Sequence, residues 1–280
     1  MKDLYKYGKA KGELLVKKYL PKRFPFESLD IISTIEEWNA IKDNYGEFIF
    51  NRVDYPIGKA EKNAKDLTSD NPDSIPDLIK KVKMQGPNGV VLCMKAKEKG
   101  VHRYENDGAF NILFNMGQSI IIELVGKGFD GHELTQGLAL HEYYIIPWEK
   151  VLFMGNRKDL EKDEDVIKRF VDSKAYAKQR ETRVKTLKDK CYHNDFDKIE
   201  ENVPKEYKKL DDNIIKDILD NIVFEMVRQE NRLRRDSLTK FGIQGNIVRG
   251  KAVPWEIFVP ERWIRRDINI NKDKSGDSER

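Results

Sequence analysis

Glu256 is the acidic residue whose position in the sequence most favours a chemical role. It stands among Trp255, Ile257 and Phe258 in an apolar stretch near the end of the chain. A carboxylate among apolar side chains costs free energy unless a cation meets it, so such a residue is a better site candidate than a surface acid. The surrounding sequence FGIQGNIVRGKAVPWEIFVPERW (241–263) predicts a compact hairpin.

A second acidic residue, Glu123, interrupts the apolar run IIIELVG and precedes a glycine-rich segment. Glycines let backbone amides approach an anion, and Lys127 adds a positive charge there. This pattern favours phosphate binding, although its spacing matches neither the Walker pattern nor the dinucleotide fingerprint. The structural alternative is an ion pair across a sheet, in which Glu123 meets Arg103 or Lys95.

The polar run RYENDGAFN (103–111) can serve in two ways. Arg103 can bind a phosphate or a carboxylate with its bidentate guanidinium, while Glu105 and Asp107 can hold a cation or a hydroxyl group. Asn-Asp-Gly is also common turn chemistry, so the same run can be simply the turn of a hairpin.

Histidine and cysteine patterns argue against other chemistries. His102, His132 and His141 lack i,i+4 or HxH spacing, and strand alternation places His141 and Glu142 on opposite faces. Neither of the two cysteines belongs to a metal-ligand motif, and no signature of a serine or cysteine hydrolase occurs. A zinc site, a disulfide framework and a nucleophile relay are therefore disfavoured.

Composition predicts a soluble, cytoplasmic globular protein. The 280 residues are 39% hydrophobic, which is enough for a core. No segment has the roughly 20 apolar residues that span a bilayer, and the N-terminus lacks the apolar run of a signal peptide. Only two cysteines are present, which fits a reducing compartment.

Charge leaves a nucleic-acid partner as an alternative. The 52 basic residues are nearly balanced by 48 acidic residues, so the formal net charge is only +4, which argues against a dedicated nucleic-acid binder. Arginines nevertheless gather at 228–235 and 262–266, where a phosphate backbone can bind. Basic groups near a helix C-terminus also offset its dipole, which is a structural explanation for the first cluster.

Hydrophobic periodicity predicts an α+β protein, with a mostly antiparallel sheet packed with helices. Strands are expected at 47–53, 89–97, 108–116, 119–126 and 139–148. Helices are expected at 33–44, 77–83 and 212–235, and one or two short helical turns within 4–20. The Asp- and Pro-rich stretch 66–76 is expected to be an exposed loop that can order over a ligand. Composition changes divide the chain into an N-terminal helical segment (1–46), a strand-rich lobe (47–155), a charge-rich helical insertion (156–209), a helix and hairpin that close the second lobe (210–266), and a flexible tail (267–280).

This order of elements resembles the ATP-grasp superfamily, whose two-lobe members clamp ATP with a strand-rich lobe. The strand GVVLCMKAK resembles the one whose lysine contacts phosphate, which implies that role for Lys95. The stretch HEYYI resembles the hinge strand beside the adenine. This resemblance implies that Glu142 and the backbone around Tyr143 bind the adenine. The final hairpin resembles the closing segment, in which Glu256 and Arg262 match an acidic residue that precedes a Pro-Arg step.

Two positions depart from the family pattern. Phe258 stands where the family usually carries an asparagine after the metal-binding glutamate, and Asn246 stands where an acidic residue is often found on the preceding strand. Both substitutions remove oxygen ligands that a hard divalent cation needs.

The resemblance implies an ATP- and Mg²⁺-dependent ligase, or a phosphoryl or nucleotidyl transferase, whose acceptor is unknown. In this hypothesis Lys95, Arg103 and Lys127 neutralise the phosphates, while Glu123 and Glu256 hold the metal. Lys95, Arg103 and Glu123 are the expected catalytic residues. The alternative is a nucleic-acid-binding or protein-interaction module without catalysis, whose arginine clusters contact the partner.

Overall fold

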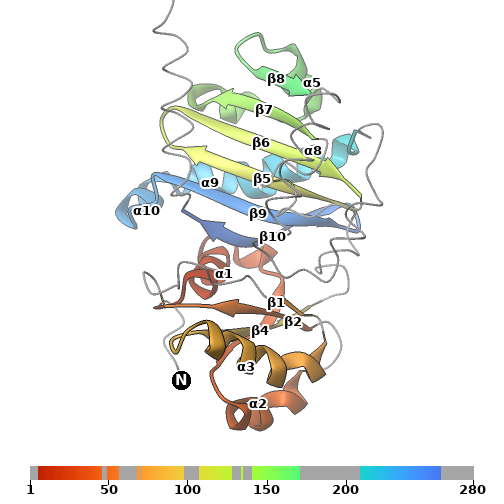
Figure 1. The fold of residues 1–280 in the computed structure, drawn as a ribbon. Coiled ribbons are helices and arrows are strands. Elements are labelled where there is room, and N and C mark those ends of the chain that lie inside the picture. Colours follow the sequence, from red (N-terminus) through yellow and green to blue (C-terminus); the bar gives the residue numbers. More distant parts are fainter. Residues whose placement is uncertain are drawn as a thin grey trace, which may run out of the picture.

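The chain folds around two antiparallel sheets. The structure is a computed structural model, and it describes residues 6–45, 49–56, 68–69, 71–97, 107–127, 134, 141–170 and 209–259. One sheet has four described strands and the other has six, and Figure 1 shows helix α1 (Gly8–Tyr19) between them. This arrangement confirms the predicted α+β class with mostly antiparallel strands.

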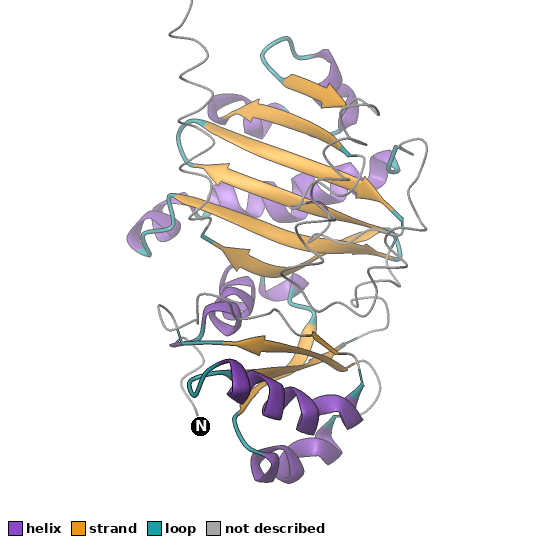
Figure 2. Cartoon of the chain, in the orientation of Figure 1, coloured by secondary structure: helices purple, strands orange, loops and turns teal. Residues whose placement is uncertain are grey.

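The smaller sheet has the strand order β1-β4-β2-β3. Its strands are β1 (Phe26–Ile32), β4 (Val90–Ala96), β2 (Ile49–Asp54) and β3 (Thr68–Ser69). Helices α2 (Ile35–Ile41) and α3 (Ile75–Gln85) lie together on this sheet (Figure 2). Trp38 of α2 and Val82 of α3 share a buried core with Val91 and Cys93 of β4.

Thr34 is the N-cap of helix α2, which begins two residues after the start of the predicted helix 33–44. The Thr34 hydroxyl accepts a hydrogen bond from the Glu37 backbone N–H (3.2 Å), and the Glu37 carboxylate accepts one from the Ser33 N–H (2.6 Å). The first bond satisfies an amide that the helix itself leaves without a partner, and the second ties the residue before the N-cap to the first turn.

The larger sheet has the strand order β10-β9-β5-β6-β7-β8. Its strands are β10 (Lys251–Phe258), β9 (Lys240–Val248), β5 (Gly108–Asn115), β6 (Ser119–Gly126), β7 (Glu142–Pro147) and β8 (Ile167–Phe170). The predicted C-terminal hairpin is β9–β10, and it turns at Arg249 and Gly250, whose φ angles are 51° and 72°. Left-handed backbone at both positions is typical of a tight two-residue turn.

The long amphipathic pattern at 212–235 forms helices that cover one face of the larger sheet. They are α8 (Asp212–Ile218), the π-helical turn η6 (Leu219–Val223), α9 (Phe224–Arg228) and α10 (Glu230–Arg235). Ile218, Ile222 and Met226 lie in the same buried core as Ile112 of β5 and Ile243 of β9. Figure 1 shows α8 and α9 behind the sheet. Among the described helices, none is both long and apolar enough to cross a lipid bilayer.

The charge-rich segment 156–209, predicted to be helical, contains a strand of the larger sheet. Helix α5 (Arg157–Lys162) follows the 3-10 turn η5 (Trp148–Phe153), but 167–170 is strand β8, which pairs with β7. An edge strand is stabilised by backbone hydrogen bonds to its one neighbouring strand. The local pattern of charged residues contains no information about that pairing. The remainder of the predicted insertion, 171–208, lies outside the described residues.

The strands of the predicted 47–155 lobe are divided between the two sheets. Strands β2, β3 and β4 belong to the smaller sheet, whereas β5, β6 and β7 join β9 and β10 in the larger one. The remaining short turns are η2 (Pro21–Arg23), η3 (Lys42–Asn44) and η4 (Pro72–Ser74). Of the loop expected at 66–76, residues 72–74 form turn η4 and 75–76 begin α3.

Candidate functional site

The larger sheet carries a row of polar side chains across five strands. Antiparallel pairing places residues opposite one another on the same face of a sheet. The pairs of this row are Glu256 with Gln244, Gln244 with Asn111, Asn111 with Glu123, and Glu123 with Tyr143. We call Glu256, Gln244, Asn111, Glu123 and Tyr143 the polar row.

The centre of the polar row is buried and incompletely hydrogen-bonded. Asn111 has no exposed surface and Gln244 is 8% exposed. The Asn111 Nδ2 donates to Glu123 Oε2 at 2.7 Å. Within the described part of the chain, Asn111 Oδ1 and Gln244 Nε2 have no hydrogen-bond partner. Burying a polar atom without a partner is costly, so these two atoms mark a place where a ligand can bind.

An apolar row runs beside the polar row on the same face, two residues further along each strand. The register pairs Phe258 with Gly242, Gly242 with Leu113, Leu113 with Ile121, and Ile121 with Ile145. We call these five residues the apolar row. Ile121 and Ile145 are partly exposed, so this face offers an apolar strip next to a polar strip.

Gly242 makes room for the Phe258 ring. A Cβ atom at Gly242 would lie 2.3 Å from Cζ of that ring. Replacing Gly242 with alanine should therefore displace the ring and cost roughly 1–3 kcal/mol of the free energy of unfolding, measured by urea denaturation. The second substitution Phe258→Leu should recover part of this loss. If the double variant is as unstable as the sum of both single variants, the two residues do not interact as proposed.

A β-bulge at Trp255 decides which way Glu256 points. The pairing register shifts between Pro254, opposite Gly245, and Glu256, opposite Gln244. Without the extra residue, Trp255 would stand opposite Gln244, and Glu256 would face the helix-covered side. The bulge thus places the carboxylate in the polar row.

Glu256 meets a cation from the smaller sheet. Arg52 of β2 donates to Glu256 Oε2 at 3.0 Å, and its guanidinium lies 5.4 Å from the centre of the Trp255 ring. This is the cationic partner that the apolar setting of Glu256 requires. Glu256 and Glu123 are three strand spacings apart, roughly 14 Å between their backbones. The two carboxylates therefore stand at different points along the row.

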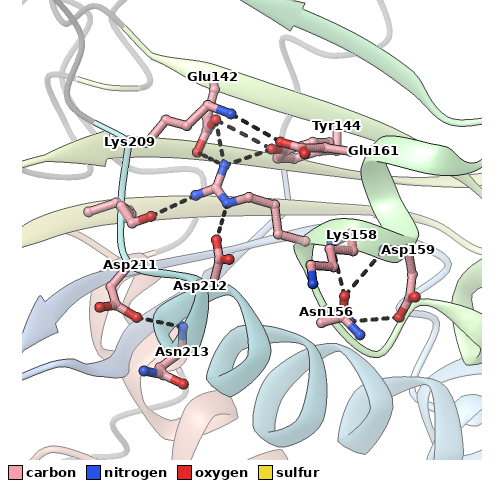
Figure 3. Close-up of polar contacts among 12 residues, drawn as sticks. Glu142, Tyr144, Asn156, Lys158, Asp159, Glu161, Lys209, Asp211, Asp212 and Asn213 are labelled. Carbon is pink, nitrogen blue, oxygen red and sulfur yellow. Dashed lines mark hydrogen bonds and ion pairs between the residues drawn. The ribbon is translucent and has the colours of Figure 1, made fainter.

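Glu142 lies on the opposite, helix-covered face of the sheet. Its side chain is 1% exposed, and Arg157 Nη1 of α5 donates to Glu142 Oε1 at 3.0 Å and to Oε2 at 2.9 Å. Arg157 also donates from Nε to Asp212 Oδ1 (2.6 Å) and from Nη2 to the Leu210 carbonyl (2.7 Å). Figure 3 shows Glu142 and Asp212 around this guanidinium, which ties β7, α5 and the start of α8 together.

The other expected site residues are dispersed. Lys95 of β4 pairs with Glu27 (3.0 Å), and strand alternation turns it to the face that carries Cys93, opposite to the face of Arg52. Lys127 is exposed just beyond β6. The structure therefore brings Glu123, Tyr143 and Glu256 into one row, but not Lys95 or Glu142.

Several expected sites lie outside the described residues. These are Arg103, Arg262 and the arginine cluster 262–266; His102 and His132, whose spacing disfavours a zinc site, lie outside as well. His141 lies beside Tyr143, with 6.1 Å between the ring centres. In the first arginine cluster, Arg234 pairs with Glu230 at 2.7 Å, and Arg232 lies 5.1 Å from the centre of the Tyr19 ring.

Sequence reasoning missed four residues that the structure brings to these sites. They are Asn111, Gln244, Arg52 and Arg157. Asn111 and Gln244 carry the signal that marked Glu123, a polar residue within an apolar strand. No sequence signal pairs Arg52 with Glu256, which are 204 residues apart, or Arg157 with Glu142, which lie on different elements.

Comparison with known proteins gives distant structural likenesses. No protein-family model matches the chain, and no curated protein matches it. The chain is structurally similar to ACD1 of Ca. Korarchaeum cryptofilum, solved in complex with coenzyme A. The two are 12% identical, the match covers 90% of this chain and 92% of that one, and the TM-score is 0.41.

The chain is also similar in structure to the D-cycloserine synthetase DcsG. Here the identity is 10%, the match covers 87% of this chain and 61% of that one, and the TM-score is 0.30. The chain thus spans less than two thirds of the length of DcsG. Neither likeness reaches a TM-score of 0.5, so neither assigns a residue role or an activity to this chain.

Proposed function

We propose that this chain is an ATP- and Mg²⁺-dependent ligase, or a phosphoryl or nucleotidyl transferase, of ATP-grasp-like build. The supporting observation is the polar row beside the apolar row on one face of the larger sheet. A nucleotide joins a flat, largely apolar base to a polyanion. Such a ligand fits a site that has an apolar strip for the base and a few polar groups that fix its orientation.

The donor atoms at the centre of the polar row suit a hard divalent cation. Glu123 supplies carboxylate oxygens, and the buried Oδ1 of Asn111 has no partner among the described residues. Mg²⁺ is usually held by one or two carboxylates together with substrate phosphates and water. Among the described residues, no group of three or more His, Cys, Asp or Glu side chains is placed so that it could hold a metal ion by itself. Bound Mg²⁺ would neutralise phosphate charge.

The chain's own residues would orient the nucleotide. Gln244 Nε2 is a buried donor without a partner among the described residues, and it can bind a phosphate or a ribose oxygen. Ile121 and Ile145 can contact the base. Lys127 directly follows β6, four residues after Glu123, and we assign it to neutralise the phosphates. We assign the same role to Arg103, on the sequence alone.

Substitution of Glu123 tests this function. We expect the wild-type protein to bind ATP more tightly with Mg²⁺ than without it, as measured by isothermal titration calorimetry. Glu123→Gln removes the charge but keeps the shape, so the Mg²⁺-dependent part of the affinity should fall at least about tenfold, or about 1.4 kcal/mol.

The matched control is Glu164→Gln, which neutralises an exposed acidic residue beyond α5. Its ATP affinity should equal that of the wild type. A wild-type protein that does not bind ATP would overturn the proposed function. Equal Mg²⁺ dependence in Glu123→Gln and the wild type would remove Glu123 from the metal site.

A further inference from the structure

Two carboxylates compete for one guanidinium where α1, β2 and β10 meet. Arg52 donates to Glu256 at 3.0 Å, while its Nη1 lies 3.8 Å from Oε1 of Glu13. Glu13, on α1, has no exposed surface. Within the described ranges, neither of its carboxylate oxygens accepts a hydrogen bond.

A buried carboxylate without hydrogen bonds is unstable as an anion. Burial raises the pKa of Glu13 well above its usual range, and the negative charge of Glu256 raises it further. Arg52 acts in the opposite direction, and weaker effects come from Asp54, which raises the pKa, and from Lys9, which lowers it. The raised pKa favours the protonated form of Glu13 while Arg52 binds Glu256.

Helix α1 packs closely against β10 beside Glu256. A Cβ atom at Gly12 would lie 2.8 Å from Cγ of Glu256 and 2.8 Å from the Ile257 carbonyl oxygen, so only a glycine lets the helix lie this close. The guanidinium already stands between both carboxylates. Transfer of its hydrogen bond from Glu256 to Glu13 requires Arg52 Nη1 to close the 3.8 Å distance to Glu13 Oε1.

We infer that Arg52 is a positioning residue with two alternative acceptors. It binds Glu256 while Glu13 carries a proton, and it binds Glu13 when that proton has passed to solvent, which frees the Glu256 carboxylate at the end of the polar row. The consequence for ligand binding rests on the function proposed above, but the exchange of the ion pair does not.

The pH dependence of unfolding of the full chain tests the proton on Glu13. A raised pKa in the folded state means that folded protein holds a proton that the unfolded chain releases. The resulting stability is complete below the ordinary carboxyl pKa and declines as pH rises toward the raised value. Over that range one proton changes the unfolding equilibrium constant tenfold per pH unit.

Glu13→Gln is neutral at every pH and nearly isosteric. Relative to this variant, the wild type should lose stability with rising pH at the one-proton slope, measured by urea denaturation in steps from pH 4.5 to 8.5. Parallel profiles for the two proteins would overturn the inference.

Glu256→Gln tests the exchange itself. With Glu256 neutral, Arg52 should pair with Glu13, which then ionises at lower pH. The pH-dependent loss of folding stability should therefore be smaller and should end at a lower pH. A profile identical to that of the wild type would show that Arg52 does not change partner.

Calorimetric titration of ATP and Mg²⁺ in two buffers of different ionisation enthalpy separates this inference from the proposed function. If the ligand engages Glu256, binding should release up to one proton in the wild type and none in Glu13→Gln. Binding without that difference would overturn the ligand coupling. Absence of nucleotide binding would overturn the proposed function. The pH profiles of unfolding would still show whether Arg52 changes its partner.

Discussion

Replacing Arg157 with methionine should lower the free energy of unfolding by about 3–5 kcal/mol. Arg157 has only 5% of its side chain exposed, and it is the cation that binds both oxygens of the buried Glu142. Methionine fills a similar volume but leaves the carboxylate without its guanidinium. The same change removes the bonds to Asp212 and to the Leu210 carbonyl.

Urea denaturation at neutral pH measures this effect, because the folded variant must bury the Glu142 side chain without its guanidinium partner.

Two controls separate the buried charge from general damage. Lys158→Met changes the exposed neighbour of Arg157 in α5 and should cost little. The double variant Arg157→Met/Glu142→Gln removes both charges and should be more stable than Arg157→Met alone at neutral pH. If the double variant is less stable, the unpaired carboxylate is not the source of the loss.

Replacing Asp54 with alanine should destabilise the protein by about 3 kcal/mol. Asp54 ends β2, yet its carboxylate accepts hydrogen bonds from the backbone N–H groups of Lys9 (3.1 Å) and Ala10 (2.9 Å) at the start of α1. It also accepts one from the Tyr55 N–H (2.8 Å). Helix α1 has no acidic residue in its first turn and no side-chain cap of its own, so Asp54 caps it from another element.

Asp54→Asn keeps the shape and one acceptor oxygen, so it should lose less stability than Asp54→Ala. Asp43→Ala, which removes an exposed carboxylate from η3, controls for the change in net charge. Amide hydrogen exchange should show that the first turn of α1 loses protection first in Asp54→Ala. A stability loss no larger than that of Asp43→Ala would contradict the capping role.

Local patterns were sufficient for most of the secondary structure. The 3.6-residue repeat of isoleucines at 212–227 predicts a helix, and the structure has one there, which continues through a π-helical turn and breaks at Gln229 before α10. The apolar runs of β4, β5 and β6 were likewise predicted as strands. Strand β8 was not, because its charged residues read as a helix and its pairing with β7 is a contact between segments.

The sequence by itself determined the type of most elements, though not of strands β1 and β8. It also determined the C-terminal hairpin and the isolation of Glu123 and Glu256 in apolar strands. Helix and strand periods are properties of neighbouring residues, so they can be read without the fold. The tertiary structure alone decided which side chains meet. The bulge at Trp255 turns Glu256 into the polar row, and the pairing of distant strands brings it to Gln244 and Arg52. A shift of one residue reverses the face of a strand, and no local pattern contains that information.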